Sequence, residues 1–248
     1  MLAPAIVHRI GPFEIPGIGP RHLRVYIPKA RPKRTPPSLL VLFDGQNVFD
    51  DRPSFNGVGW RAHEAVERLR SRAPIVIAVE HGGKTRLDEL SPFAGPRSRG
   101  LLPGLVDWLA DEVVTDAWKK LGVLPEPRGV IIGGSSMGGL AAMYAHHKRP
   151  DRFGAALCMS SSFWFGHGRI LEHVAQTHRP LASRIYLDVG KREGRAMVES
   201  SRALVSVLHS RGYGGNDLAY RLDPRGKHDE RAWRRRFGAA VRFLSRAR

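Results

Sequence analysis

A serine flanked by glycines lies near the middle of the 248-residue chain. The stretch Gly134–Gly138 fits the pattern G-x-S-x-G, with Ser136 at its centre. An apolar run, Val130–Ile132, precedes this stretch and a helix-forming run, Leu140–Ala145, follows it, so a strand must turn sharply into a helix here. Glycines on both sides of the serine let neighbouring backbone approach without a clash against a Cβ atom. The pattern therefore predicts a nucleophilic serine on a strained turn.

The helix that begins after Ser136 is also expected to bind negative charge. Free N–H groups and the helix dipole stabilise an anion at a helix N-terminus. The backbone N–H of Met137 is therefore a predicted donor of an oxyanion hole. A second interpretation stays open, in which the stretch is a glycine-rich turn and Ser135 or Ser136 only caps the helix. The two glycines centre on Ser136, which favours Ser136 over Ser135 as the nucleophile.

An activated serine needs a histidine base, and that histidine needs a partner that fixes its tautomer. In the arrangement that the serine motif indicates, the chain order is serine, acid, histidine. His228 follows the last strand-like run and precedes the last helical pattern, so we predict it to be the base. His81 precedes the serine. Other histidines lie in or beside helical patterns and are interpreted as surface residues: His146, His147, His167, His173, His178 and His209.

The acid is expected to follow the strand-like run Ile185–Val189. Two carboxylates compete for this role: Asp188 lies inside the run, and Glu193 lies on the loop beyond Gly190. A loop position suits a group that must reach across to the histidine, which favours Glu193. Asp188 stays an alternative, because side-chain direction alternates along a strand and the sequence does not fix its face.

The second oxyanion donor is expected in the loop after the early run Leu39–Phe43. This loop begins at Asp44. Gly45 permits a tight turn that would aim the backbone N–H of Gln46 inward, and Asn47 is the alternative donor.

Short apolar runs alternate with helical patterns along the chain. The strand-like runs are Leu39–Phe43, Ile75–Val79, Val130–Ile132, Ala155–Met159, Ile185–Val189 and Leu218–Leu222. The helical patterns lie near residues 60–70, 101–121, 137–148, 196–211 and 229–246. Together they predict an α/β fold in a single domain, 1–248, with a mostly parallel sheet covered by helices on both faces. Val7–Phe13 and Leu23–Ile27 are expected to add antiparallel edge strands, and residues 28–37 an exposed loop.

Composition indicates a globular protein without membrane insertion. Apolar residues make up 42% of the chain, and no stretch approaches the roughly 20 apolar residues that span a bilayer. The stretch Met1–Ile10 lacks the pattern of a secretory leader. A single cysteine, Cys158, excludes an intrachain disulfide and offers no metal cluster. We therefore expect a cytoplasmic protein without a metal or an organic cofactor.

The formal net charge of +17 favours anionic partners. The densest basic run, Arg231–Arg248, carries apolar residues at helical spacing, with Trp233, Phe237, Val241 and Leu244 on one side. This pattern indicates an amphipathic helix with a solvated arginine-rich face rather than a nucleic-acid site. The oligomeric state stays open, and a dimer is compatible with the charge.

These motifs resemble the putative-esterase family of α/β-hydrolases, which includes enterochelin esterases, feruloyl esterases and S-formylglutathione hydrolases. The resemblance runs from about residue 22 to the end and is closest to the enterochelin-esterase-like branch. Its features are Leu42–Asn47, Val79–Gly83, Arg86–Pro92, Gly133–Gly139, Pro150–Gly154, Ser160–Trp164 and the loops of Gly190 and His228. The resemblance implies an α/β-hydrolase fold and an acid three residues after Gly190, which is Glu193, where aspartate is commoner.

The resemblance also implies an aromatic residue near the acyl site, here Phe163 or Trp164, with core packing as the alternative. It implies that Arg86 and Glu89 form a buried structural pair below the site. The segment from Ser160 to Ser183 is too short for a large lid, so an open cleft is expected.

The predicted function is hydrolysis of small-molecule carboxylic esters through an acyl-enzyme, with Ser136, His228 and Glu193 as a triad. The positive charge suggests acidic esters as substrates. An acyltransferase would use the same triad, with an alcohol in place of water. A non-catalytic basic module on a hydrolase scaffold is the alternative from a different class.

Overall fold

A computed structural model describes residues 6–29 and 35–245. The predicted loop at 28–37, the stretch Met1–Ile10 and the end of the basic run therefore lie partly outside the described residues. Within that part of the chain, eight strands form one sheet in the order β1-β2-β4-β3-β5-β6-β7-β8. The strands are β1 (Val7–Ile15), β2 (Gly19–Tyr26), β3 (Leu39–Leu42), β4 (Ile75–Val79), β5 (Val130–Ser135), β6 (Ala155–Met159), β7 (Arg184–Gly190) and β8 (Leu218–Asp223).

The sheet is mostly parallel, as the sequence predicted. Strands β3 to β8 pair in parallel, whereas β2 is antiparallel to both β1 and β4. The two early strands therefore form the antiparallel edge. In a parallel arrangement the carboxyl ends of β3 to β8 lie along one edge, and the loops that follow them are the ones that can meet.

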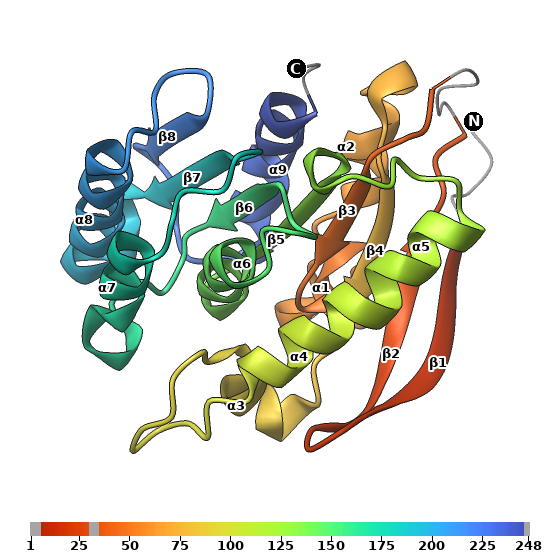
Figure 1. Cartoon of the computed structure of the whole chain (residues 1–248), viewed down its shortest axis with the longest axis horizontal. Coiled ribbons are helices and arrows are strands. Elements are labelled where there is room, and N and C mark those ends of the chain that lie inside the picture. The colour runs from red at the N-terminus through yellow and green to blue at the C-terminus, as the bar shows by residue number, and fades with distance from the viewer. Residues whose placement is uncertain (1–5, 30–34, 246–248) are drawn as a thin grey trace.

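Helices connect the strands and cover the sheet (Figure 1). They are α1 (Gly45–Val48), α2 (Ala62–Glu67), α3 (Arg86–Leu90), α4 (Leu102–Trp108), α5 (Thr115–Lys120), α6 (Met137–Lys148), α7 (Arg169–Gln176), α8 (Arg195–Ser210) and α9 (Glu230–Leu244). A π-helical stretch, Leu109–Val114, joins α4 to α5, so that the two form one continuous rod (Figure 1).

Two hydrophobic cores lie on opposite faces of the sheet because strand side chains alternate in direction. In β3, Leu39 and Val41 belong to one core, with apolar residues from α4, α6, α7 and α8. Leu40 and Leu42 belong to the other core, with residues from α2 and α9. Helix α6 directly follows the candidate nucleophile and is buried from Met137 to His147. A helix buried on all sides gives the serine turn a rigid support.

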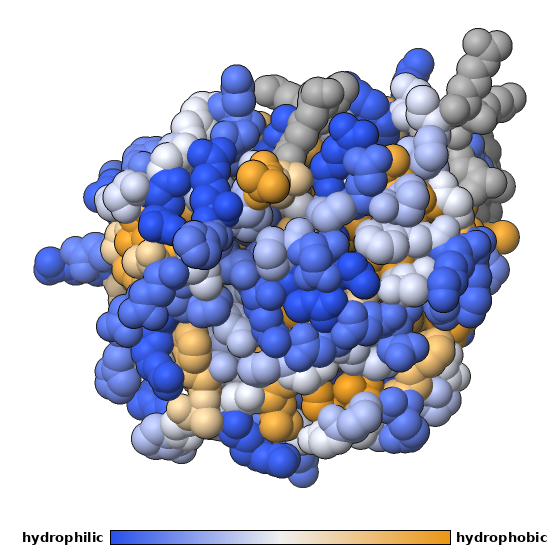
Figure 2. All heavy atoms as spheres, viewed as in Figure 1, coloured by the Kyte–Doolittle hydropathy of each residue, from blue (hydrophilic) through white to orange (hydrophobic). Residues whose placement is uncertain are grey.

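The face shown in Figure 2 is mostly hydrophilic, with apolar side chains in small groups. Among the described residues, no helix is both long and apolar enough to cross a membrane.

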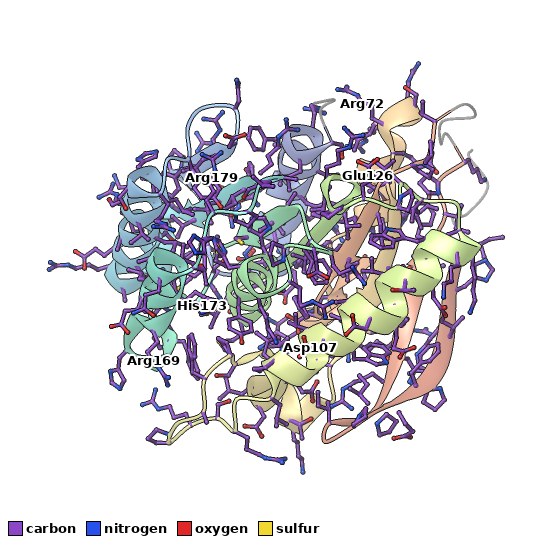
Figure 3. All side chains as sticks on the ribbon, in the orientation of Figure 1. Arg72, Asp107, Glu126, Arg169, His173 and Arg179 are labelled. Carbon is purple, nitrogen blue, oxygen red and sulfur yellow. The ribbon has the colours of Figure 1, made fainter. Side chains whose placement is uncertain are left out.

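Two histidines predicted to lie on the surface are buried, and that prediction was wrong. His146 has no solvent-exposed surface. Its Nδ1 lies 2.8 Å from the Phe153 carbonyl oxygen, and its Nε2 lies 2.6 Å from Ser183 Oγ. Burial lowers the pKa of His147 to about 4. His173, labelled on α7 in Figure 3, packs on Tyr144 with ring centroids 4.8 Å apart. The sequence pattern shows that these histidines are helical but not that both faces of α6 are covered.

Candidate active site

Ser136 occupies a strained turn between β5 and α6. Its φ of 55° and ψ of −121° lie outside the regions that non-glycine residues normally adopt, at a cost of about 1–3 kcal/mol. A Cβ atom on Gly134 would lie 2.6 Å from the carbonyl carbon of Gly138, so the motif's first glycine is required by close backbone approach. The strain is held by the strand, the turn and the buried helix together.

His228 lies between the serine and the candidate acid. Its Nε2 is 3.0 Å from Ser136 Oγ. The loop that carries His228 is held against the end of β7, because a Cβ atom on Gly190 would lie 2.4 Å from Gly226 and the Arg192 amide donates to the Gly226 oxygen at 3.1 Å. Two loops distant in sequence are thus fixed side by side.

Glu193 contacts His228 from the other side. Its Oε2 is 3.0 Å from His228 Nδ1, and its side chain is fully buried. The second oxygen, Oε1, accepts hydrogen bonds from Ser160 Oγ at 2.6 Å and from the Gly190 amide at 2.7 Å. Burial acts to raise the pKa of Glu193, but the hydrogen bonds from His228, Ser160 and Gly190 outweigh burial and hold the pKa below its ordinary value. An ionised Glu193 can only accept, so Nδ1 of His228 carries the proton and Nε2 faces the serine as an acceptor.

Asp188, the alternative acid, faces a different partner. Its buried carboxylate lies 3.5 Å from the Arg236 guanidinium. Burial raises the pKa of Asp188 to about 7, with Arg236 acting in the opposite direction and Glu193 acting in the same one. Of the two carboxylates, Glu193 is therefore the one hydrogen-bonded to His228.

Two predicted oxyanion donors begin helices at the same sheet edge. Met137 is the first residue of α6, and Gln46 lies in the first turn of α1, where backbone N–H groups have no acceptor within the helix. The Gln46 side chain is locked to the His81 backbone, donating to its oxygen at 2.8 Å and accepting from its amide at 3.2 Å. The Asn47 amide donates to the Asp44 oxygen at 2.8 Å, so this N–H is already used.

A cleft of about 420 Å³ opens beside Ser136 and His228. Its lining residues are Asp44, Asn47, Phe55, Asn56, His81, Gly83, Arg86, Ser135, Ser136, His228, Glu230 and Trp233. The lining includes no residue of the segment 160–183, but Ser162 of this segment lies beside the nucleophile, with its Oγ 3.3 Å from Ser136 Oγ. Within the lining, Arg86 pairs with Asp44 and also interacts electrostatically with Glu230, so the protein's positive charge is not concentrated here.

Neither of the two aromatic residues predicted near the acyl site, Phe163 and Trp164, lines this cleft. Phe163 is buried in the core, with 1% of its surface exposed. Trp164 is 44% exposed, and its Nε1 contacts Met197 Sδ at 2.9 Å beside a separate hollow. The aromatic side chains that line the cleft are Phe55 and Trp233. Sequence reasoning missed both.

Arg86 and Glu89 do not pair with each other, and that expectation was wrong. Arg86 forms a two-point ion pair with the buried Asp44, at 2.6 and 2.7 Å. Glu89 instead pairs with Arg21 and accepts from the Gly82 amide at 3.1 Å. The partners are distant in the chain, Asp44 after β3 and Arg21 in β2, so chain proximity gave no guide to the pairing.

Helix α9 is amphipathic as predicted, but not all of its arginines face solvent. Arg236 is buried, and Arg234 pairs with Asp51 at 2.5 Å and donates to the Gly59 oxygen. Of the described arginines in this helix, Arg231, Arg235 and Arg242 are the exposed ones. The basic run is thus divided between buried, paired and solvated positions.

The parallel sheet, the strained serine after β5 and the loops after β7 and β8 define an α/β-hydrolase fold. The chain belongs to the Esterase family, whose model, described as "Putative esterase", matches residues 19–244.

The proteins to which the chain is similar include enterobactin esterases. The chain is 28% identical over 223 residues to the iron(III) enterobactin esterase of Dickeya dadantii, a match that covers 79% of this chain and 45% of that protein. The enterobactin esterase structure from Shigella flexneri superposes with a TM-score of 0.74 at 22% identity, over 98% of this chain and 59% of that one. The BES protein structure from Bacillus cereus superposes with a TM-score of 0.77 at 16% identity, over 100% and 97% of the two chains. The chain spans half or less of the length of the curated relatives it matches.

Proposed function

We propose that the protein is a serine hydrolase that cleaves carboxylic esters through an acyl-enzyme. The observation that carries the proposal is the continuous row of contacts from Ser136 Oγ to His228 Nε2 at 3.0 Å and from His228 Nδ1 to Glu193 Oε2 at 3.0 Å. Nucleophile, base and orienting acid are thus in hydrogen-bonding distance in the order that acyl transfer requires. Membership in the esterase family supports the same reaction.

In the first half of the reaction, His228 takes the proton of Ser136 as the serine oxygen attacks the ester carbonyl. The Met137 and Gln46 N–H groups hold the oxyanion, and Glu193 stabilises the imidazolium. His228 then gives its proton to the leaving alcohol. In the second half, His228 activates a water molecule that attacks the acyl-enzyme and frees Ser136. Loss of one oxyanion donor is expected to lower kcat by about 10²- to 10³-fold.

We further propose that the substrates are small, polyfunctional anionic esters of the siderophore type. Two observations support this class: the names of the similar proteins and the net charge of +17. Since Arg86 is balanced by Asp44 and Glu230 in the cleft lining, attraction for an anion would come from the surrounding surface. Such attraction is screened by salt. A preference for anionic over neutral esters should therefore be largest at low salt.

The test is hydrolysis of short-chain p-nitrophenyl esters by the wild type and by Ser136→Ala. We expect turnover that falls by several orders of magnitude in the variant, with Ser206→Ala, at an exposed serine of α8, as the matched control close to wild type. Equal turnover by wild type and Ser136→Ala would refute the assignment of the nucleophile. For the substrate class, equal kcat/KM for neutral and anionic esters at low salt would refute the preference for anions.

A further inference from the structure

The C-terminal helix α9 contributes two side chains beneath the candidate triad. Trp233 and Arg236 are three residues apart, which places them on one face of the helix. Trp233 Nε1 donates to Ser160 Oγ at 2.9 Å, and the Arg236 guanidinium donates to the same oxygen at 2.7 Å. The ring of Trp233 also meets the His228 ring edge-on, with centroids 5.1 Å apart.

These two donors determine the direction of the Ser160 hydroxyl. A serine hydroxyl has one hydrogen to donate and two lone pairs to accept with. Trp233 and Arg236 occupy both lone pairs, so the hydrogen of Ser160 is left for Glu193 Oε1, which lies 2.6 Å away. Ser160 is therefore an obligatory donor to Glu193, and Oε1 must be an acceptor.

Ser160 itself is held in place by the backbone. It is fully buried, and its φ of 44° is left-handed. Its amide donates to the backbone carbonyl oxygen of Asp188 at 2.8 Å. The Gly190 amide adds a second donor to Glu193 Oε1, at 2.7 Å. With Oε1 fixed by two donors, Oε2 is the oxygen that faces His228.

We propose that Ser160 and Arg236 are positioning residues that keep Glu193 ionised and oriented toward His228. The inference rests on the proposed function and assigns a role in the site to a buried arginine of α9. Arg236 acts through Ser160 and through its own proximity to Glu193 Oε1, 3.5 Å away. The Arg236 guanidinium also lies 3.5 Å from the Asp188 carboxylate and 3.9 Å from the Asp223 carboxylate, so Glu193, Asp188 and Asp223 share one cation.

The alternative is a purely structural role, in which Arg236 only balances buried carboxylates. The two roles differ in what is lost on substitution. A structural role predicts fewer correctly folded molecules, each with normal activity. A positioning role predicts a normal number of active sites, each of which reacts more slowly.

The experiment uses the full chain and measures kcat, KM and the fraction of sites titrated by a fluorophosphonate. The variants are Ser160→Ala, Arg236→Met, Arg236→Lys and the double variant Ser160→Ala/Arg236→Met. Arg242→Met is the matched control, since Arg242 is an exposed arginine of the same helix. We expect Ser160→Ala and Arg236→Met each to lower kcat by about 10- to 100-fold with KM unchanged, the loss that one hydrogen bond to a charged group accounts for.

Three further results are expected. The double variant should be at most about threefold slower than the slower of the two single variants, because both substitutions act on the same oxygen, Glu193 Oε1. Arg236→Lys should recover part of the loss. The Ser160 hydrogen bond lowers the pKa of Glu193, so in Ser160→Ala the Glu193 carboxyl should titrate at higher pH than in wild type, followed by the ¹³C shift of its carboxyl carbon.

Unchanged kcat in both single variants, or a loss that matches the loss of titratable sites, would overturn the positioning role. A second readout does not depend on turnover. The Nδ1 proton of His228, bonded to Glu193, should give a downfield NMR resonance that His228→Ala removes and that Ser160→Ala shifts or broadens. An unshifted resonance in Ser160→Ala would overturn the proposal even if esters were not substrates, whereas equal ester turnover by wild type and Ser136→Ala would refute only the proposed function.

Discussion

Replacing Glu193 by glutamine tests the orientation of the base most sharply, because both carboxylate oxygens are acceptors. Oε2 accepts from His228, and Oε1 accepts from Ser160 and the Gly190 amide. A glutamine side chain supplies one acceptor oxygen and one donor NH₂ group. The NH₂ group must therefore face either the histidine or the other two donors.

The hydrogen-bond count decides between these orientations. If the NH₂ group faced Ser160 and Gly190, two buried donors would lose their acceptor, at about 1–3 kcal/mol each. If it faces His228, no hydrogen bond is lost as long as the imidazole changes tautomer, so that Nδ1 accepts from the NH₂ group. The second arrangement is favoured, and it leaves Nε2 protonated, so it can no longer accept the proton of Ser136. The same tautomer error in a serine protease lowers kcat by about 10⁴-fold, or about 5 kcal/mol in activation free energy.

We therefore expect Glu193→Gln to lower kcat for a p-nitrophenyl ester by about 10³- to 10⁴-fold, with KM within about threefold of wild type. Circular dichroism and a thermal unfolding curve check that the fold is retained. Glu199→Gln is the matched control, because Glu199 is an exposed residue of α8 paired with Arg195. A loss of less than tenfold in Glu193→Gln would refute the assignment of Glu193 as the orienting acid.

Three other predictions follow from the buried groups. Asp188→Asn should keep kcat within about tenfold of wild type, since Asp188 contacts Arg236 rather than the base; a loss equal to that of the Glu193 variant would contradict this. His147 is neutral in the fold, with a pKa of about 4, so the unfolded chain binds its proton first and stability falls as pH drops below about 6.5. In urea unfolding, wild type should therefore lose about 2 kcal/mol more stability between pH 7 and pH 4.5 than His147→Gln loses, and identical losses would contradict it. Gly139→Ala should destabilise the fold by about 1–3 kcal/mol, because its Cβ would lie 2.0 Å from Ser161 Oγ. The same change at the exposed Gly104 of α4 meets only one atom, 3.9 Å away, and should stabilise by up to about 1 kcal/mol; equal thermal shifts would contradict the packing argument.

The fold was predictable from the sequence because its signals are local. Apolar runs, turn glycines and helical spacing are each read within about ten residues, and they place every parallel strand. The motif around Ser136 is local too, since Gly134 must be glycine to pass the Gly138 backbone. Chain order then predicts His228 and the Gly190 loop, and with it Glu193 as a candidate acid.

Contacts between distant segments were not predictable. Arg236 belongs to a run of arginines that looks solvated, but it is buried because its partners come from β7 and the loops after β6 and β7. His146 and His147 were misread because the sequence of α6 does not show that both its faces are covered. Ser160 begins a segment that the family resemblance singles out, but its role depends on two donors from α9 that the sequence does not place beside it.

The most direct test of the central claim is covalent trapping of the nucleophile with diethyl p-nitrophenyl phosphate. An activated Ser136 should attack phosphorus and release p-nitrophenolate, and intact-mass and peptide analysis should find one diethylphosphoryl group on Ser136. Labelling should disappear in Ser136→Ala and slow strongly in His228→Ala, in step with ester hydrolysis. A label on another residue, or ester turnover that survives full labelling of Ser136, would contradict the account.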